Sequence, residues 1–439
     1  MRTTVVAAGA IVVAAVAAVP YVCGRVLEQE VRTAIDDYNK RQSFMAASIV
    51  SYDRQWLRSS FVTRLAIRDG AEVARATTEM RHAPFTGLRL ASGDIDVHFA
   101  ETLAATENYY FSGKVPLRID FDIELGGATS GTLRTAGVDK PLIGSPNVRL
   151  LAAPSSGSFS IVRDKIFRID WTLPKASYED PKVAVAVEGV ALSAFGQLGD
   201  DDMSEPSGLK IAVASAAASS GGGMGERRVA VKGFSLSTQM TPSAESLKFA
   251  LALRAGAGEA ALDASPYTWE SLDLQCSVSD VPKAPVVKYS ADVRNLSDID
   301  ANESQKMLLA LRALSELAAS VAQGDPAFAV DKLELKTPQG ILSASLRVGI
   351  DKARATATPE AWTAADGFVM SGRASVSRPL AVRILRAAAP GEAEAQAAIA
   401  RLAARGVVRE SGDALEFDIA ARDGVYLVNG VRATELARM

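Results

Sequence analysis

The chain has 439 residues, of which 48% are hydrophobic, 6% aromatic and 23% charged, and its formal net charge is −3. The hydrophobic share excludes an intrinsically disordered chain, and the length allows a sizeable buried core. Two Cys exclude a disulfide scaffold, and two Cys with two His are a poor supply of zinc ligands. The small negative net charge gives no argument for binding nucleic acid.

The first predicted element is a membrane anchor. From Thr3 to Gly24 the chain carries no charge and is rich in Ala, Val and Ile. A helix of this length spans roughly 33 Å at about 1.5 Å per residue, which is enough for a hydrocarbon core of about 30 Å. We therefore predict an anchor or signal-anchor over 1–25. A cleaved signal peptide stays an alternative, because Ala15 and Ala17 would tolerate cleavage.

The orientation of this segment is weakly specified. Arg2 precedes the apolar run, and Arg25 and Arg32 follow it, so basic residues flank both sides. The N-terminal position of the run favours export of the part that follows. The mild acidity of that part gives no reason to expect docking onto anionic lipid.

Most of the remaining chain is predicted to be β-strand. A short amphipathic helix is expected over 26–43, and apolar and polar residues then alternate with a period of two. The clearest strand is 114–125, where Ile119, Phe121 and Ile123 alternate with acidic residues. Further strands are predicted at 158–173, 182–192, 209–217, 228–240, 246–254, 272–279, 328–336, 341–350, 367–377, 414–421 and 424–428.

Two helices interrupt the strands. A capping box with Asp300 as N-cap and Glu303 as its partner predicts a helix over 301–323. The second helix is expected over 379–405, with a break near Pro390. Loops are predicted at 126–145, 199–207 and 219–225. The last of these divides a β-rich part over 26–220 from a second over 221–439.

The spacing of the strands indicates the fold class. Parallel pairing needs a crossover of a dozen or more residues, and most of the predicted strands follow one another too closely for that. We therefore expect an α+β fold that is predominantly antiparallel β, with large curved or sandwiched sheets, a few helices and one transmembrane helix.

No motif predicts catalysis or a cofactor. Gly256-Ala257-Gly258 matches a relaxed dinucleotide fingerprint, but a hairpin turn between two strands is the better interpretation. The run 298–302 imitates a calcium loop but lacks the required Gly and Glu, so helix capping is favoured. His82 and His98 stand apart from Cys276, which argues against a metal site. We expect no enzyme activity, no metal and no cofactor.

Short motifs along the chain resemble those of a known family. They are the Gly24 to Glu28 step after the apolar run, Tyr52, Arg54 and Ser59 in YDRQWLRS, His82, Pro84 and Phe85 in HAPF, and Asn429 and Gly430 in LVNGV. In these motifs the chain is similar to the YdgA-like proteins, a bacterial envelope family of unknown function. It departs at Gln55 and Ala83, where the family has Gly, and at Leu57, where it has Phe.

The resemblance implies a location rather than a reaction. It implies a single-pass protein of the bacterial inner membrane with its C-terminal part in the periplasm. The family supplies no catalytic residues, so the role of its motif residues stays open. A physical interpretation is that Arg54 and His82 satisfy buried backbone groups where the first strands enter the sheet.

These observations lead to two functional hypotheses. The first is a membrane-tethered envelope protein with a non-enzymatic scaffold or partner-binding role. The alternative is handling of a lipid or another apolar ligand in a β-sheet groove. Envelope proteins, lipid or a second copy of the chain are the expected partners, and nucleic acid is not.

Overall fold

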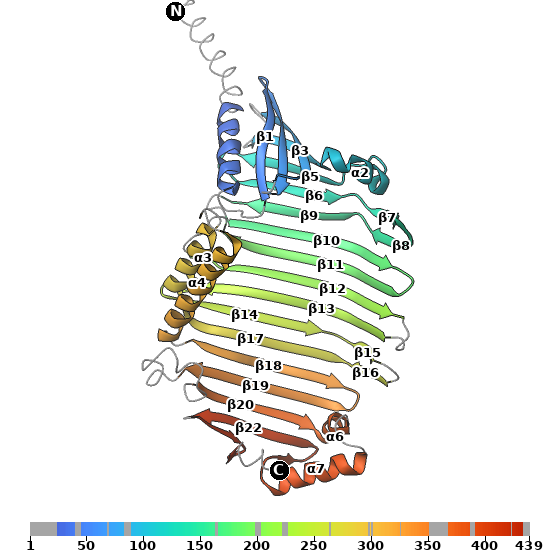
Figure 1. The fold of residues 1–439 in the computed structure, drawn as a ribbon, viewed down its shortest axis with the longest axis vertical. Coiled ribbons are helices and arrows are strands. Elements are labelled where there is room, and N and C mark those ends of the chain that lie inside the picture. Colours follow the sequence, from blue (N-terminus) through green and yellow to red (C-terminus); the bar gives the residue numbers. More distant parts are fainter. Residues whose placement is uncertain are drawn as a thin grey trace, which may run out of the picture. The chain divides into compact units, whose positions relative to one another are not determined.

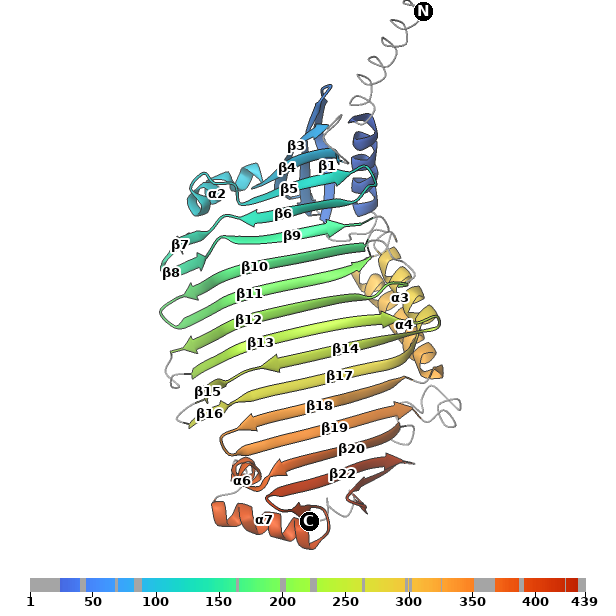
Figure 2. The same ribbon diagram turned by 180° about the vertical axis from the view of Figure 1, so that it is seen from behind.

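A computed structural model describes the fold (Figures 1 and 2). The described residues are 24–39, 45–67, 70–82, 89–162, 166–197, 203–221, 227–262, 265–296, 299, 302–324, 326–350, 368–386, 391–422 and 424–432. The predicted anchor over 1–25 therefore lies outside them, except for Gly24 and Arg25. Within these ranges, no helix combines the length and the apolar character that a membrane crossing requires.

The chain forms two compact units. Unit 1 comprises Met1–Tyr178 and Ala191–Gly199, and unit 2 comprises Glu179–Val190 and Asp200–Met439. The strand β11 (Val183–Gln197) has residues in both. The sequence-based boundary at 220/221 stays a prediction.

Unit 1 begins with a helix over 24–39 and continues as an antiparallel meander. Its strands pair in the order β1-β2-β3-β4-β5-β6-β9-β10, and β7 and β8 form a separate hairpin. The elements are β1 (Met45–Arg54), β2 (Arg58–Ile67), β3 (Glu72–His82), β4 (Arg89–Phe99), α2 (Ala104–Phe111), β5 (Leu117–Glu124), β6 (Thr129–Thr135), β7 (Val138–Leu142), β8 (Ser145–Ala152), β9 (Ser155–Ile161) and β10 (Ile166–Glu179).

Unit 2 is a second antiparallel meander. Its main strands pair in the order β12-β13-β14-β17-β18-β19-β20-β22-β23-β24. They are β12 (Ser207–Ser220), β13 (Arg227–Pro242), β14 (Ser246–Ala255), β17 (Ser271–Pro282), β18 (Ala327–Thr337), β19 (Gly340–Ile350), β20 (Phe368–Ser377), β22 (Ala414–Arg422), β23 (Val425–Val428) and β24 (Val431–Arg432), with short β15 (Gly258–Leu262), β16 (Ser265–Trp269) and β21 (Arg409–Ser411) beside them. The predicted antiparallel, β-dominated fold is confirmed.

Two helix pairs belong to unit 2. The pair α3 (Lys283–Asn295) and α4 (Glu303–Gln323) lies at one set of strand ends, and α6 (Arg378–Arg386) with α7 (Glu392–Ala404) lies beside the last strands (Figure 1). The predicted break between the last two helices is confirmed. The N-cap of α4 is Asn302, whose side chain accepts from the Gln305 amide, so the predicted capping box on Asp300 is wrong by two positions.

Three local predictions are corrected by the strand registers. The predicted loop 126–145 contains β6 and β7, which weakly apolar residues such as Thr129 and Thr135 conceal. The predicted strand 158–173 is a hairpin of β9 and β10. Gly256 is not in a hairpin turn, because β14 and β15 both pair with β13, and Gly256 interrupts what is otherwise one strand.

The core is divided between the units. In unit 1, Leu27 of the first helix packs with Phe61, Met80 and Ala91 of the sheet. In unit 2, residues of α6 and α7 cover the last strands in one cluster: Leu380, Ala381, Val382, Ala395 and Ile399 pack with Val376, Val408 and Leu415. In each unit, a helical element therefore covers part of one sheet face.

Candidate functional site

Four of the motif residues come together in unit 1, at the ends of β1, β2 and β3. Arg54 stands opposite Ser59 in the β1–β2 register, and Ser59 stands opposite Met80. His82 ends β3 and faces Ala91 of β4. Tyr52 stacks on Phe61 with ring centroids 5.3 Å apart. The sequence motifs therefore mark a single place in the fold.

This cluster joins the first helix to the sheet. The buried Ser59 Oγ lies 3.1 Å from Nε2 of the buried His82. A Cβ atom at Gly24 would lie 2.5 Å from Cε1 of His82, so the helix backbone meets the imidazole directly and only Gly fits. One turn later, Glu28 Oε2 accepts from Arg54 Nη1 at 3.0 Å. The far end of the helix is held as well, because Asn39 makes two hydrogen bonds to the Ala47 backbone.

The electrostatics of the cluster reflect its burial. Burial raises the pKa of Tyr52 above its ordinary value, and the nearby Ser59 hydroxyl acts in the opposite sense. Glu28 adds to the rise, while Arg54 and Arg32 oppose it. These contacts favour a neutral phenol in a packed junction. The predicted role of Arg54 and His82 toward buried backbone groups stays a prediction, since the contacts above join them to Glu28 and Ser59.

The C-terminal motif residues form a tight turn. Asn429 (φ 50°) and Gly430 (φ 84°) connect β23 to β24, as a two-residue turn with both residues left-handed requires. The Asn429 side chain accepts from the Asp418 amide and donates to the carbonyls of Val407 and Glu416. These two residues are thus structural. Pro84 and Phe85 lie outside the described residues.

One face of the unit 2 sheet is apolar. Paired residues of an antiparallel sheet point to the same face, so the registers can be followed from strand to strand. One such row crosses β12, β13, β14, β17, β18, β19, β20 and β22, and every member is apolar: Ile211, Leu236, Leu253, Leu274, Leu333, Ala344, Ala374 and Phe417. At about 4.8 Å per strand the row is roughly 34 Å long.

A second row confirms the same face. It runs through Met240, Phe249, Val278, Phe328, Val348, Met370 and Ala421. At the end near α6 and α7 the face is covered, and Leu415 is only 2% exposed. Over the earlier strands it is open: Phe249 and Leu251 are each 37% exposed and Phe328 is 43% exposed. We call these rows the apolar face.

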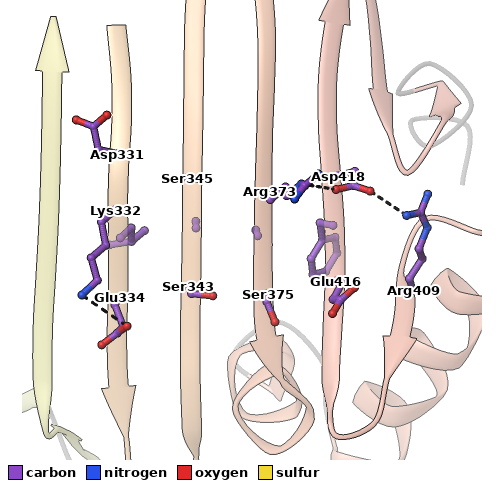
Figure 3. Close-up of a pocket in the computed structure, with 14 residues that line it drawn as sticks. Asp331, Lys332, Glu334, Ser343, Ser345, Arg373, Ser375, Arg409, Glu416 and Asp418 are labelled. Atoms are coloured by element: carbon purple, nitrogen blue, oxygen red, sulfur yellow. Dashed lines mark hydrogen bonds and ion pairs between the residues drawn. The ribbon is translucent and has the colours of Figure 1, made fainter.

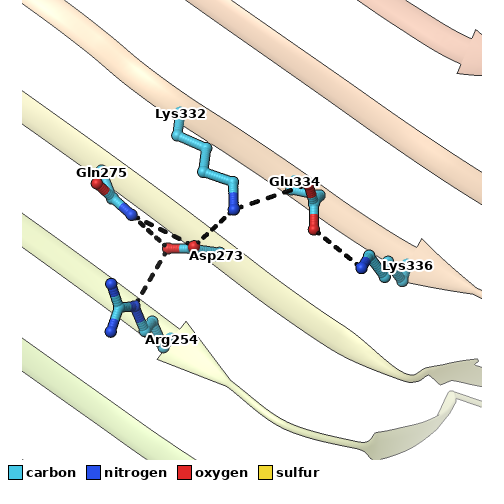
Figure 4. Close-up of polar contacts among 6 residues, drawn as sticks. All are labelled: Arg254, Asp273, Gln275, Lys332, Glu334 and Lys336. Carbon is cyan, nitrogen blue, oxygen red and sulfur yellow. Dashed lines mark hydrogen bonds and ion pairs between the residues drawn. The ribbon is translucent and has the colours of Figure 1, made fainter.

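The opposite face of the same strands is polar. Its corresponding row consists of Ser235, Arg254, Asp273, Glu334, Ser343, Ser375 and Glu416. Figure 4 shows its charged centre, where Asp273 accepts from Lys332 Nζ at 2.9 Å and from Gln275 Nε2 at 3.1 Å. The hydrogen bond from the Lys332 ammonium has the largest effect on the pKa of Asp273, which it lowers. Burial acts in the opposite sense, and the Gln275 side chain adds a smaller lowering.

This polar face contains a hollow of about 560 Å³ over β18, β19, β20 and β22. In Figure 3, Asp418 lies between two arginines, with Arg409 Nη1 at 2.9 Å and Arg373 Nε at 3.5 Å. Lys332 and Glu334 line the same hollow 3.7 Å apart. Cations and carboxylates neutralise each other here, so the hollow has the character of a solvated, ion-paired surface.

The alternation that builds the apolar face is visible in the sequence, but the continuity of the face is not. Each strand is recognisable by itself, whereas the row from Ile211 to Phe417 depends on registers that are set by turns and bulges. The bulge between Val330 and Leu333, for example, restores Leu333 to the apolar face. The signal in the sequence that indicates this face is the two-residue period of apolar residues within each strand.

The comparisons with known proteins show a family, and the YdgA-like resemblance stays a prediction. A family model described as a bacterial protein of unknown function (DUF945) matches residues 1–434. No curated protein and no solved structure matches the chain. Because the family model covers nearly the whole sequence, the chain belongs to the DUF945 family of bacterial proteins of unknown function.

Proposed function

We propose that this protein is a membrane-tethered member of the YdgA-like group that binds lipid acyl chains, or another elongated apolar ligand, on the apolar face of unit 2. The uncharged run from Thr3 to Gly24 supports the tether, and we place the C-terminal part in the periplasm. The role is a binding role without catalysis.

The continuous apolar face is the observation that carries this proposal. Monomeric soluble proteins rarely leave a large contiguous apolar surface in water, and such a surface usually marks a binding site. Here the open part includes Phe249, Leu251 and Phe328, each more than a third exposed. Small side chains such as Ala344 and Ala374 leave room above the strands for a ligand.

The shape of the face favours a long, flexible and apolar ligand. The rows run across the strands, so an acyl chain lying along them would meet side chains from one strand after another. The ion pair of Asp273 and Lys332 lies on the other face. Among the neighbours of Leu251 on the apolar face, Thr238 brings a hydroxyl group. A ligand on the apolar face would therefore meet few unsatisfied hydrogen-bonding groups.

Photocrosslinking tests the binding face. The full chain is reconstituted into vesicles that contain a phospholipid with a photoreactive acyl chain, and crosslinked peptides are mapped by mass spectrometry. We expect crosslinks at peptides that contain Leu251 and Phe328, and severalfold fewer in the variants Leu251→Asp and Phe328→Asp. The matched control is Ile341→Asp, because Ile341 is 48% exposed but pairs with Lys336 on the polar face. Equal crosslinking in all variants would refute the assignment.

The location has its own test. A fusion of alkaline phosphatase to the C-terminus is active only when that terminus is exported. We expect activity in the full-length fusion and none when residues 3–24 are deleted. Activity that is independent of this segment would contradict the tether.

A scaffold or partner-binding role is the second candidate, and α4 favours it. Met307, Leu308, Leu311 and Leu314 form a stripe at helical spacing, and they are 48–66% exposed. Such a stripe can enter the groove of another protein. Crosslinking in intact cells would detect a partner, and Leu308→Ser with Leu311→Ser would abolish it. Retention of every crosslinked product in this variant would exclude α4 as the docking element.

A further inference from the structure

We infer that the β1–β2 turn of unit 1 is a membrane-surface contact, in which Trp56 and Leu57 enter the lipid interface and Arg58 and Arg81 bind the phosphates of anionic headgroups. The inference rests on the membrane tether proposed above. It concerns a different part of the molecule from the apolar face.

The turn presents apolar side chains to solvent. The backbone N–H of Gln55 donates to the Arg58 carbonyl and closes a tight turn between β1 and β2. At its tip, Trp56 is 56% exposed and Leu57 is 48% exposed. Trp residues are favoured at membrane interfaces, because the ring is amphipathic and its N–H finds polar partners there.

Two arginines beside the turn lack acidic partners among the residues that the structure describes. Arg58 of β2 and Arg81 of β3 stand directly opposite each other in the register. Within the described part of the chain, neither has a carboxylate within ion-pair distance. Like charges placed opposite each other destabilise a sheet. A bound phosphate would remove this repulsion, and the guanidinium group has the geometry for it.

The arginines also border a hollow of about 400 Å³ over β2, β3, β4, β5 and β6 of unit 1. Arg89 lines it and pairs with Asp122 at 3.1 Å. The hollow contains acidic residues too, of which Asp94 and Asp120 are each 3.3 Å from Arg118. Glu79 lines the end nearest the turn as well, and Arg58 and Arg81 outnumber this single carboxylate, so that end is the cationic part of the hollow.

The position of the turn points to a lipid surface as the occupant. The Leu57 carbonyl accepts from the His82 amide, and the imidazole of His82 meets the backbone of Gly24. Gly24 is the last residue of the apolar run that we place in the bilayer. The turn is therefore next to the point where the chain leaves the membrane. Local charge, rather than the mildly acidic total, decides what can bind here.

Tryptophan quenching by brominated lipids tests the contact. The chain has four Trp residues and none in residues 3–24, so the anchor itself contributes no signal. The full chain is inserted into vesicles of phosphatidylethanolamine and phosphatidylglycerol that carry brominated acyl chains. We expect quenching in the wild type, its loss in Trp56→Phe, and its retention in the matched control Trp269→Phe. Quenching that persists in Trp56→Phe would overturn the inference.

The arginines are tested in the same vesicles. At about fivefold per arginine, the double variant Arg58→Gln with Arg81→Gln should lower the docking equilibrium constant by about twenty-fivefold. Vesicles of brominated phosphatidylcholine, which lack anionic lipid, should quench the wild type less than the vesicles that contain phosphatidylglycerol. Equal quenching with and without anionic lipid would refute the phosphate contact. Flotation separates the membrane tether from the docking of the β1–β2 turn. A chain that does not float with vesicles refutes both the tether and the docking. A chain that floats while Trp56 is unquenched refutes only the docking.

Discussion

At the scale of single residues, the motif residues of unit 1 are explained by a packed junction. Gly24, Glu28, Arg54, Ser59 and His82 meet where the first helix crosses the first strands. The short motifs were visible in the sequence. Their convergence was not, because it depends on the rotation of the helix and on the β1–β2–β3 registers. Residues recognised by type alone therefore acquire a role only through their neighbours.

The variant Gly24→Ala tests the junction. Its Cβ would lie 2.5 Å from Cε1 of His82 and 3.0 Å from Nδ1, so the buried imidazole would have to shift, and its contact with Ser59 would be disturbed. We expect a loss of about 1–3 kcal/mol in the free energy of unfolding, despite the higher helix propensity of Ala. Urea denaturation measures it. The control is Gly126→Ala, where a Cβ meets open space. Equal stability of both variants would contradict the close contact.

The Asp273 carboxylate predicts a pH dependence of stability. Lys332 lowers the pKa of Asp273 in the folded state, so the folded chain favours the ionised form. Its stabilising contribution is present above the unfolded pKa and is lost as the pH falls through the folded pKa. We expect Asp273→Asn to be less stable than the wild type at neutral pH, with the difference shrinking below about pH 4. Denaturant titrations at both pH values measure it, and a constant difference would contradict the ion pair.

At the scale of elements, strong alternation predicts strand positions well, whereas turns and caps are not fixed by residue type alone. The strands with strong alternation, such as β5 and β14, lie close to their predicted positions. The strand β6 is not predicted, because Thr, Ser and Gly weaken its pattern. The Gly at position 131 is required by packing, since a Cβ there would collide with the Asp120 carbonyl and the Phe159 ring. The start of α4 was misplaced, because Asp300 and Asn302 are both good N-caps by type.

The β23–β24 turn supplies a prediction at this scale. Asn429→Ala removes three side-chain hydrogen bonds and places Ala at a left-handed φ of 50°. We expect a loss of about 2–3 kcal/mol in the free energy of unfolding. Asn429→Gly keeps the left-handed backbone conformation accessible and loses only the side-chain hydrogen bonds. Its stability should therefore lie between that of the Ala variant and that of the wild type. Thermal unfolding gives the order, and an Ala variant as stable as the Gly variant would contradict the turn geometry.

At the scale of the whole molecule, each of the two units is a two-faced sheet that a helical element covers only in part. In unit 2 the rows through Leu253 and Phe328 stay apolar from strand to strand, and the row through Asp273 on the other face stays polar. The composition and period of the sequence predicted antiparallel sheets with one wet face. The open apolar face could not be predicted, since it depends on what packs against each strand.

Native mass spectrometry of the full chain, released from its membrane in a mild detergent, tests the apolar face most directly. Lipid bound along the rows of unit 2 predicts a folded protein that carries phospholipid masses, which diminish in Phe328→Asp and persist in the matched Ile341→Asp. A folded wild-type chain that is free of lipid, under conditions in which the membrane lipids themselves remain detectable, would contradict a lipid-binding role.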